Sequence, residues 1–120
     1  MNLEGAVSKL HEHHERWNKK RGLRIIYRDY FNTILNHCVK GKTLEVGAGF
    51  GAFKDYSEHT VSTDIVRMKR LDVVCDAHYL PFASASFSNI VAIDFLHHLE
   101  RPIKFLQQAA DVLCIGGRLV

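Results

Sequence analysis

Four carboxylates fall at or near the ends of short apolar runs, and this placement suggests what chemistry the chain can do. They are Glu45, Asp64, Asp76 and Asp94. The runs alternate with helical or loop segments, which is typical of parallel strands whose carboxyl ends share one edge of a sheet. A carboxylate in such a place is costly unless it is hydrogen-bonded or solvated. Each acid alone could be a strand-end or helix cap, but the set predicts a crevice lined with hydrogen-bond acceptors.

A glycine-rich loop, GAGFG at residues 47–51, follows the first of these acids. Glycines at this point permit a tight turn and let the backbone approach a ligand closely. With Ala52 as the third small residue, the loop also fits the pattern of dinucleotide-binding proteins. Glu45 argues against a dinucleotide, because a carboxylate beside the loop repels a pyrophosphate. It favours instead a ligand with a cationic end and no phosphate, such as S-adenosylmethionine (SAM).

Hydrophobic spacing predicts the segments that must position these residues. An amphipathic helix is predicted from Leu23 to Cys38, and a second helix from Pro102 to Leu113. Short strands are predicted at 43–46, 60–64, 72–76 and 90–94, with a short helix at 52–57 and a further strand starting at 118–120. The expected fold class is therefore α/β, a doubly wound and mainly parallel sheet. Because the fifth strand has only begun when the chain stops, we expect the N-terminal part of a longer protein.

Length and composition exclude several classes of protein. The 120 residues are 47% hydrophobic and 24% charged, which is ordinary for one globular domain and unlike a disordered chain or a coiled coil. The aliphatic run Ile90–Ile93 is far shorter than the roughly 18 residues of a membrane helix. The first ten residues contain no apolar segment of the kind that a secretory signal carries. We expect a soluble, cytoplasmic protein with no membrane partner.

Positive charge is concentrated near the N-terminus. Residues 1–42 carry nine Lys and Arg against four Asp and Glu, whereas residues 43–120 carry seven against nine. We therefore divide the chain into a polar, basic leader at 1–22, either a solvated helix or a mobile segment, and a domain at 23–120.

Two motifs in the leader invite a functional interpretation. Lys19, Lys20 and Arg21 lie near Trp17 and would suit nucleic acid, but three charges are few and a solvated helix face is favoured. The histidines of HEHHER at 11–16 do not have the spacing of a zinc site, so no metal is predicted.

Four segments in order resemble class I, Rossmann-like SAM-dependent methyltransferases, and in particular the type 11 group. They are TLEVGAGFG at 43–51, VSTDI at 61–65, CDAHYLPFASASFSNIVAIDFLHHLERP at 75–102 and GGRLV at 116–120. The resemblance covers about residues 41–120. It implies a Rossmann-like, SAM-binding methyltransferase domain at 23–120, incomplete at its C-terminal end. It also implies methyl transfer to an unidentified acceptor, a small molecule or another molecule, with S-adenosylhomocysteine (SAH) as the product.

The resemblance implies that the glycine loop lies along the methionine portion of the cofactor. The matching positions are Glu45, Gly47, Ala48, Gly49 and Gly51.

The remaining matched residues fall along the rest of the cofactor. Asp64 is expected to accept hydrogen bonds from the ribose hydroxyls, with Ile65 packed on the adenine. Asp76 is expected to accept from the adenine amino group, while the amide of Ala77 meets a ring nitrogen. Asp94 follows the fourth strand, beside the methyl group.

His97 and His98 are the candidates for catalysis, because they follow the fourth strand where the resemblance places the acceptor. A neutral histidine suits a general base if the acceptor carries a proton of high pKa, although one of the pair could instead cap or pack the next helix. The segment before the first strand often covers the cofactor in this family, which makes Trp17, Tyr27 and Tyr30 candidates for that role.

The sequence also departs from the family pattern. Asn89, Arg101 and Cys114-Ile115 stand where other residues are usual, and we expect them at surface or turn positions. Two other functions remain open: a non-catalytic partner or regulatory protein that keeps the fold, and an NAD(P)-dependent oxidoreductase. Because the sheet is expected to be incomplete, we expect this chain alone to be inactive and to associate with itself through the open sheet edge.

Overall fold

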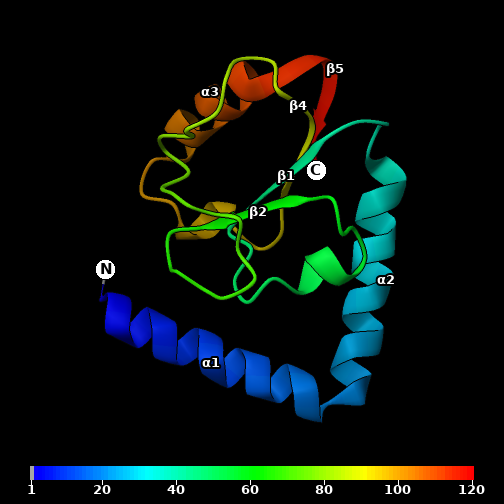
Figure 1. Cartoon of the computed structure of the whole chain (residues 1–120), viewed down its shortest axis with the longest axis vertical. Coiled ribbons are helices and arrows are strands. Elements are labelled where there is room, and N and C mark those ends of the chain that lie inside the picture. Colours follow the sequence, from blue (N-terminus) through cyan, green and yellow to red (C-terminus); the bar gives the residue numbers. More distant parts are fainter. Residues whose placement is uncertain (1) are drawn as a thin grey trace.

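The centre of the molecule is a parallel sheet of five strands (Figure 1), in a computed structural model that describes residues 2–120. The strands are β1 (Thr43–Val46), β2 (Val61–Asp64), β3 (Val73–Val74), β4 (Phe87–Ala92) and β5 (Leu113–Leu119). Their order is β3-β2-β1-β4-β5, and every neighbouring pair is parallel. All carboxyl ends therefore lie at one edge of the sheet. The predicted fold class is confirmed.

Helices cover both faces of the sheet. They are α1 (Leu3–Lys19), α2 (Arg21–His37) and α3 (Pro102–Val112), with short 3-10 helices at Ala52–Asp55 and Leu96–His98. Asn2 begins α1 by accepting the N–H of Gly5 with its side chain, and Pro102 occupies the first turn of α3, where its missing N–H costs nothing. Among residues 2–120, no helix has both the length and the apolar character needed to cross a membrane.

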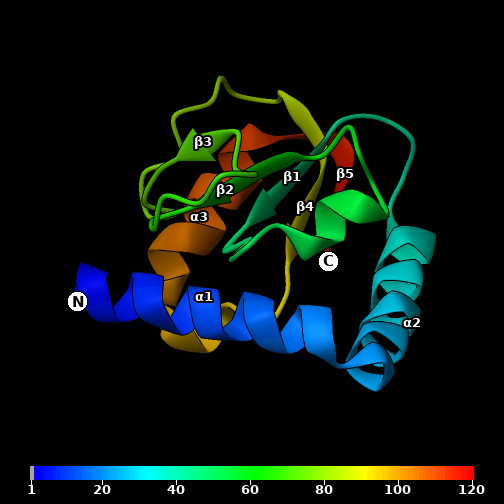
Figure 2. The ribbon, with the colours of Figure 1, turned by 60° about the horizontal axis from the view of Figure 1, so that its bottom comes forward.

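Two hydrophobic clusters hold these layers together. Phe105 of α3 packs in one cluster with Leu44 and Ile90, while Phe31 of α2 packs in the other with Val91. Successive side chains of a strand point to opposite faces, which is why Ile90 and Val91 belong to different clusters. Figure 2 shows α1 in front of the lower end of α3, with α2 to one side of the strands.

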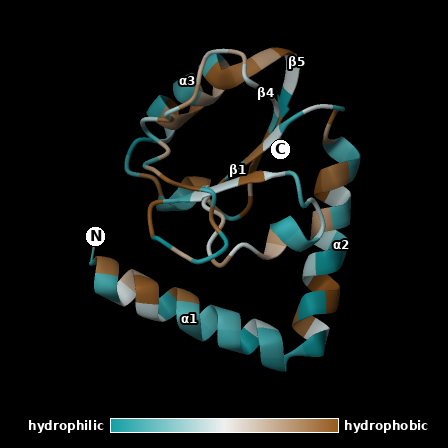
Figure 3. Cartoon of the chain, viewed as in Figure 1, coloured by the Kyte–Doolittle hydropathy of each residue, from teal (hydrophilic) through white to brown (hydrophobic). Residues whose placement is uncertain are grey.

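The N-terminal helices form an L (Figure 1), because Lys20 alone separates them. Lys20 is extended, with φ −110° and ψ 95°. The guanidinium of Arg24 spans the bend and donates to the carbonyls of Trp17 and Asn18, at 2.7 and 2.8 Å. Figure 3 shows α1 as largely hydrophilic, yet Trp17 near its C-terminal end is buried. The expected leader is thus helical and is fixed to α2 at this bend.

The strand β5 begins earlier than predicted. The sequence predicts a glycine break before a strand at Arg118, whereas the strand already starts at Leu113. Leu113 pairs with Phe87 and Arg118 pairs with Asn89, so five steps along β5 match only two along β4. Gly116, with φ +80°, lies in this bulge. Glycine here permits a bulge inside the strand rather than ending the helix.

Asn89 is buried, not at the surface or in a turn as expected. It lies within β4 and is 1% exposed. Its side-chain oxygen accepts the N–H of Val39 at 2.8 Å, and its amide nitrogen donates to the carbonyl of Val39 at 2.8 Å and to the hydroxyl of Thr43 at 3.2 Å. The amide therefore satisfies both backbone groups of the residue that leads from α2 towards β1. An aspartate at this position could not donate when ionised.

We expect Asn89→Asp to lower the free energy of unfolding by roughly 1–3 kcal/mol, because the Val39 carbonyl loses its donor and a carboxylate becomes buried. Chemical denaturation at pH 7 measures this change. The matched control is Asn32→Asp on the exposed side of α2, which should change stability by less than about 0.5 kcal/mol. Equal losses in the two variants would contradict the role given to the Asn89 amide.

Candidate functional site

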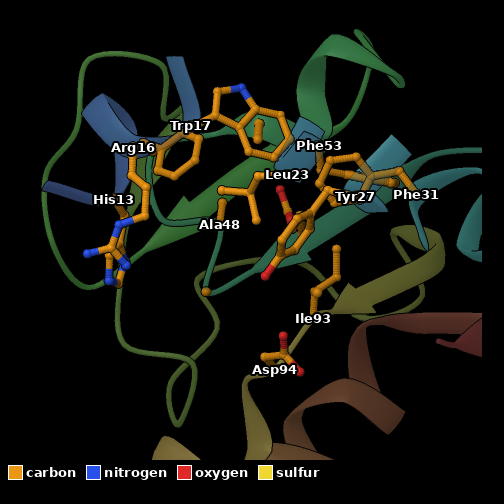
Figure 4. Close-up of a pocket in the computed structure, with 14 residues that line it drawn as sticks. His13, Arg16, Trp17, Leu23, Tyr27, Phe31, Ala48, Phe53, Ile93 and Asp94 are labelled. Carbon is orange, nitrogen blue, oxygen red and sulfur yellow. The ribbon is translucent and has the colours of Figure 1, made fainter. Parts of the chain in front are cut away.

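A cavity of about 350 Å³ lies beside the glycine loop, at the carboxyl edge of the sheet. Its aromatic lining includes Trp17 from α1 and Tyr27 and Phe31 from α2. Figure 4 shows Trp17 and Arg16 on one side of the cavity and Asp94 on the other. Residues that line the cavity thus come from α1 and α2, which precede β1, and from the segment after β4.

The glycine loop (residues 47–51) has a backbone conformation that is unfavourable for residues other than glycine. Gly47 and Gly49 have φ of +65° and +60°, in the left-handed region. A Cβ atom on Gly47 would lie 2.3 Å from a ring carbon of Phe95, so no side chain fits there. Both the φ angles and this close approach account for glycine at these positions.

Asp64 holds the glycine loop in place from the end of β2. One carboxylate oxygen accepts the N–H of Gly49 at 2.9 Å, and the other accepts the N–H of Val66 at 3.0 Å. The side chain expected to bind ribose therefore also orders the loop expected to lie along the methionine portion.

Glu45 is the buried acid of the site. It lies in β1, lines the cavity and is 3% exposed. Burial, together with the nearby carboxylate of Asp64, raises the pKa of Glu45 from 4.5 to about 8, although Lys54 opposes the shift. No hydrogen bond from residues 2–120 reaches its Oε1 atom. A buried polar atom without a partner is uncommon and points to a missing ligand or water.

Asp94 is the second carboxylate of the cavity. It lies two residues beyond β4 and adopts φ +48°, which is uncommon outside glycine although aspartate tolerates it better than most residues. Such backbone conformations cost free energy and concentrate at functional sites.

The other predicted cofactor residues lie outside the cavity lining. Asp76 and Ala77 are on the loop after β3, and Ile65 is an exposed residue directly after β2. Hydrogen bonds from His78 lower the pKa of Asp76, so this acid is ionised near neutral pH. Of the predicted set, the cavity wall contains Glu45, Gly47, Ala48 and Asp94, while Gly49, Gly51, Asp64, Ile65, Asp76 and Ala77 lie outside it.

His97 and His98 are both exposed, on the short 3-10 helix that follows β4. Their ring centroids are 3.9 Å apart, and neither ring lines the cavity. Their catalytic role stays a prediction. Of the three aromatic residues proposed to cover the cofactor, Trp17 and Tyr27 line the cavity, whereas Tyr30 is 56% exposed and does not.

Of the α1 residues at this site, sequence reasoning identified Trp17 and missed the others. His13 and Arg16 line the cavity, and the ring of His14 stacks on Phe50 of the glycine loop with centroids 5.0 Å apart. Trp17 packs against the same ring at 5.7 Å. The spacing of Leu10, His14 and Trp17 places them on one helix face, and this was the available signal.

The raised pKa of Glu45 makes stability depend on pH. Between pH 4.5 and about 8 the folded chain keeps a proton that the unfolded chain releases, so stability falls as pH rises, by up to about 1.4 kcal/mol per unit. Glu45→Gln should remove this slope, because glutamine stays neutral. Urea unfolding at pH 5.5, 6.5 and 7.5 (about one unit apart) measures it. Parallel stability curves for the two proteins would show that Glu45 ionises normally.

Comparison with known proteins places this chain in a family. Residues 44–120 match the family model described as a methyltransferase domain. An uncharacterized protein of Methanocaldococcus jannaschii is 26% identical over 123 residues, which cover 96% of this chain and 59% of that protein. The mouse protein named "Probable tRNA methyltransferase 9B" is 33% identical over 89 residues, which cover 63% of this chain and 20% of that protein.

Solved structures show the same fold. A SAM-dependent methyltransferase from Thermotoga maritima has a TM-score of 0.79 at 19% identity, over 98% of this chain and 60% of that one. The 1,6-didemethyltoxoflavin-N1-methyltransferase of Burkholderia thailandensis, solved with SAH bound, has a TM-score of 0.69 at 21% identity, over 98% of this chain and 58% of that one. This chain thus spans at most about three fifths of the length of these relatives. Because the family match extends from β1 to the end of the chain and includes the glycine loop, the chain belongs to the methyltransferase domain family.

Proposed function

We propose that this chain binds SAM and serves methyl transfer to an acceptor. The observation that carries the proposal is the buried, unpartnered oxygen of Glu45 in the wall of a cavity beside the glycine loop. Such an atom needs a hydrogen-bond donor, and the donor favoured by a carboxylate is a cation. The ammonium group of SAM is a donor of this kind.

The residues at the methionine end fit that ligand. Glu45 and Asp94 would accept from its ammonium group, and Gly47 and Ala48 of the glycine loop line the same cavity. Arg16 lines the cavity on the side away from Asp94 and would balance the carboxylate of the amino acid end.

The acids outside the cavity would hold the other end of the cofactor. Asp64 at the end of β2 would accept from the ribose hydroxyls, with Ile65 against the adenine. Asp76 would accept from the adenine amino group, next to the amide of Ala77. These roles come from the family resemblance, and the parallel sheet supports them because the ends of β1, β2, β3 and β4 share one edge.

Bound SAM would supply an electrophilic methyl group on a positively charged sulfur. The task of this chain is then to hold the reacting centre in position and to exclude water from it. Trp17, Tyr27 and Phe31 provide an apolar wall for that purpose. Where the acceptor must lose a proton, His97 or His98 would receive it from the exposed side of the carboxyl edge.

We expect SAH to stabilise this chain against thermal unfolding, by about 2.7 kcal/mol at a concentration 100 times its Kd. NADH at the same concentration should leave the melting temperature unchanged. Trp17, the single tryptophan of the sequence, lines the cavity, so its fluorescence should change as SAH is added. Titration followed by fluorescence gives the Kd directly.

Stabilisation by NADH and not by SAH would overturn the proposal in favour of an oxidoreductase. A chain that binds SAH while the complete protein transfers no methyl group from labelled SAM would limit the proposal to cofactor binding, as in a non-catalytic partner protein.

Glu45 should also link cofactor binding to proton release. With a pKa of about 8, its carboxyl is mostly protonated at pH 7, and a bound ammonium group would favour the ionised form. We therefore expect SAH binding at pH 7 to release close to one proton and its affinity to increase between pH 6 and about 8. Calorimetry in buffers of different ionisation enthalpy measures the release. The Glu45→Gln variant should release none, and equal release in both proteins would assign the proton to another group.

A further inference from the structure

His78 is a buried histidine beside one of the proposed cofactor acids. It is 8% exposed, on the loop that follows β3. Asp76, two residues earlier, has a side chain that is 42% exposed. A half-exposed carboxylate on a loop can rotate freely unless something holds it, and His78 is the residue placed to do so.

The hydrogen bonds of His78 define which ring nitrogen carries its proton. The Nε2 atom accepts the backbone N–H of Arg101 at 3.2 Å. Because that N–H can only donate, Nε2 carries no proton, and the neutral ring has its proton on Nδ1. Nδ1 lies 2.7 Å from Oδ1 of Asp76 and therefore donates to it.

The same carboxylate oxygen accepts a second hydrogen bond, from the backbone N–H of His78 at 2.9 Å. Both contacts fall on Oδ1, and no hydrogen bond from residues 2–120 reaches Oδ2. Asp76 thus has one oxygen fixed by the protein and the other available. The hydrogen bonds from His78 also lower the pKa of Asp76, which keeps the free oxygen an acceptor only.

The imidazole ring also makes a contact outside its own loop. Any residue at position 78 could supply the backbone N–H, but the ring also joins the loop after β3 to Arg101, where α3 begins. The guanidinium of Arg101 donates to the hydroxyl of Tyr79 at 3.1 Å, which is a second contact between this loop and the start of α3. His78 therefore fixes Asp76 relative to a helix that packs in the sheet core.

We propose that His78 is a positioning residue for the adenine end of the cofactor, holding Asp76 so that its free oxygen accepts the adenine amino group. This inference rests on the proposed binding of SAM. It adds a basis for specificity, because an oxygen that can only accept favours an amino group over a carbonyl at that place of the purine.

Two variants test the hydrogen bonds of the two ring nitrogens separately. In His78→Asn the side-chain amide keeps a donor near the Nδ1 position but has no acceptor for Arg101. In His78→Gln an acceptor reaches the Nε2 position, but the donor to Asp76 is lost. The ligands are SAH and S-inosylhomocysteine, which carries a carbonyl in place of the adenine amino group. Fluorescence of Trp17 and calorimetry measure both affinities.

We expect His78→Gln to weaken SAH binding about tenfold, and His78→Asn to weaken it less, by about threefold, because asparagine keeps the donor to Asp76 and loses only the contact with Arg101. The affinity for S-inosylhomocysteine should be the same in all three proteins. Unchanged SAH affinity in His78→Gln, or equal losses for both ligands, would overturn the positioning role. Wild-type protein that does not bind SAH at all would instead overturn the proposed function, and the inference with it.

A measurement on the wild-type protein keeps the inference testable if a variant does not fold. Nitrogen NMR of the labelled imidazole should show His78 neutral and protonated at Nδ1, with a shift that changes when SAH binds but not when S-inosylhomocysteine binds. A proton on Nε2 instead, or the same response to both ligands, would contradict the inference.

Discussion

The parallel pairing of β1 with both β2 and β4 is the interaction on which the site depends. Leu44 pairs with Val61 on one side and with Ile90 on the other, so β1 has no free edge. Both faces of the sheet are covered as well, and Glu45 is 3% exposed and lines the cavity. The same pairing directs the glycine loop out of the sheet between Asp64 and the segment after β4.

The acids of this edge differ in charge because their surroundings differ. Glu45 is surrounded by protein and has no donor at one oxygen, so burial raises its pKa. Asp76 is half-exposed and receives two hydrogen bonds, so its pKa is lowered. One end of the proposed site therefore holds a neutral carboxyl that ionises in the presence of a cation, and the other end holds a carboxylate that is charged before a ligand arrives.

The sequence was sufficient for features that depend on local pattern. The alternation of apolar runs and acids predicts β1 from Thr43 to Val46 and places α2 and α3 within a few residues of their ends. It was insufficient where distant segments meet. The burial of Asn89 depends on Val39 passing β4, fifty positions away in the chain, and the bulge of β5 depends on its register with β4. The cavity wall formed by α1 depends on the bend at Lys20, which no periodicity indicates.

That bend has a consequence for how a ligand reaches the cavity. The central sheet fixes α2 at its far end, since the side chain of Asn89 holds Val39 beside β4. A rotation at Lys20 would therefore swing α1 outward while α2 stays with the sheet. Such a hinge movement must break the two hydrogen bonds from Arg24 to Trp17 and Asn18 and separate the rings of His14 and Trp17 from Phe50. In such a movement Arg24 would act as a latch, and the rate at which it opens would limit how fast a ligand that fills the cavity could be exchanged by this route.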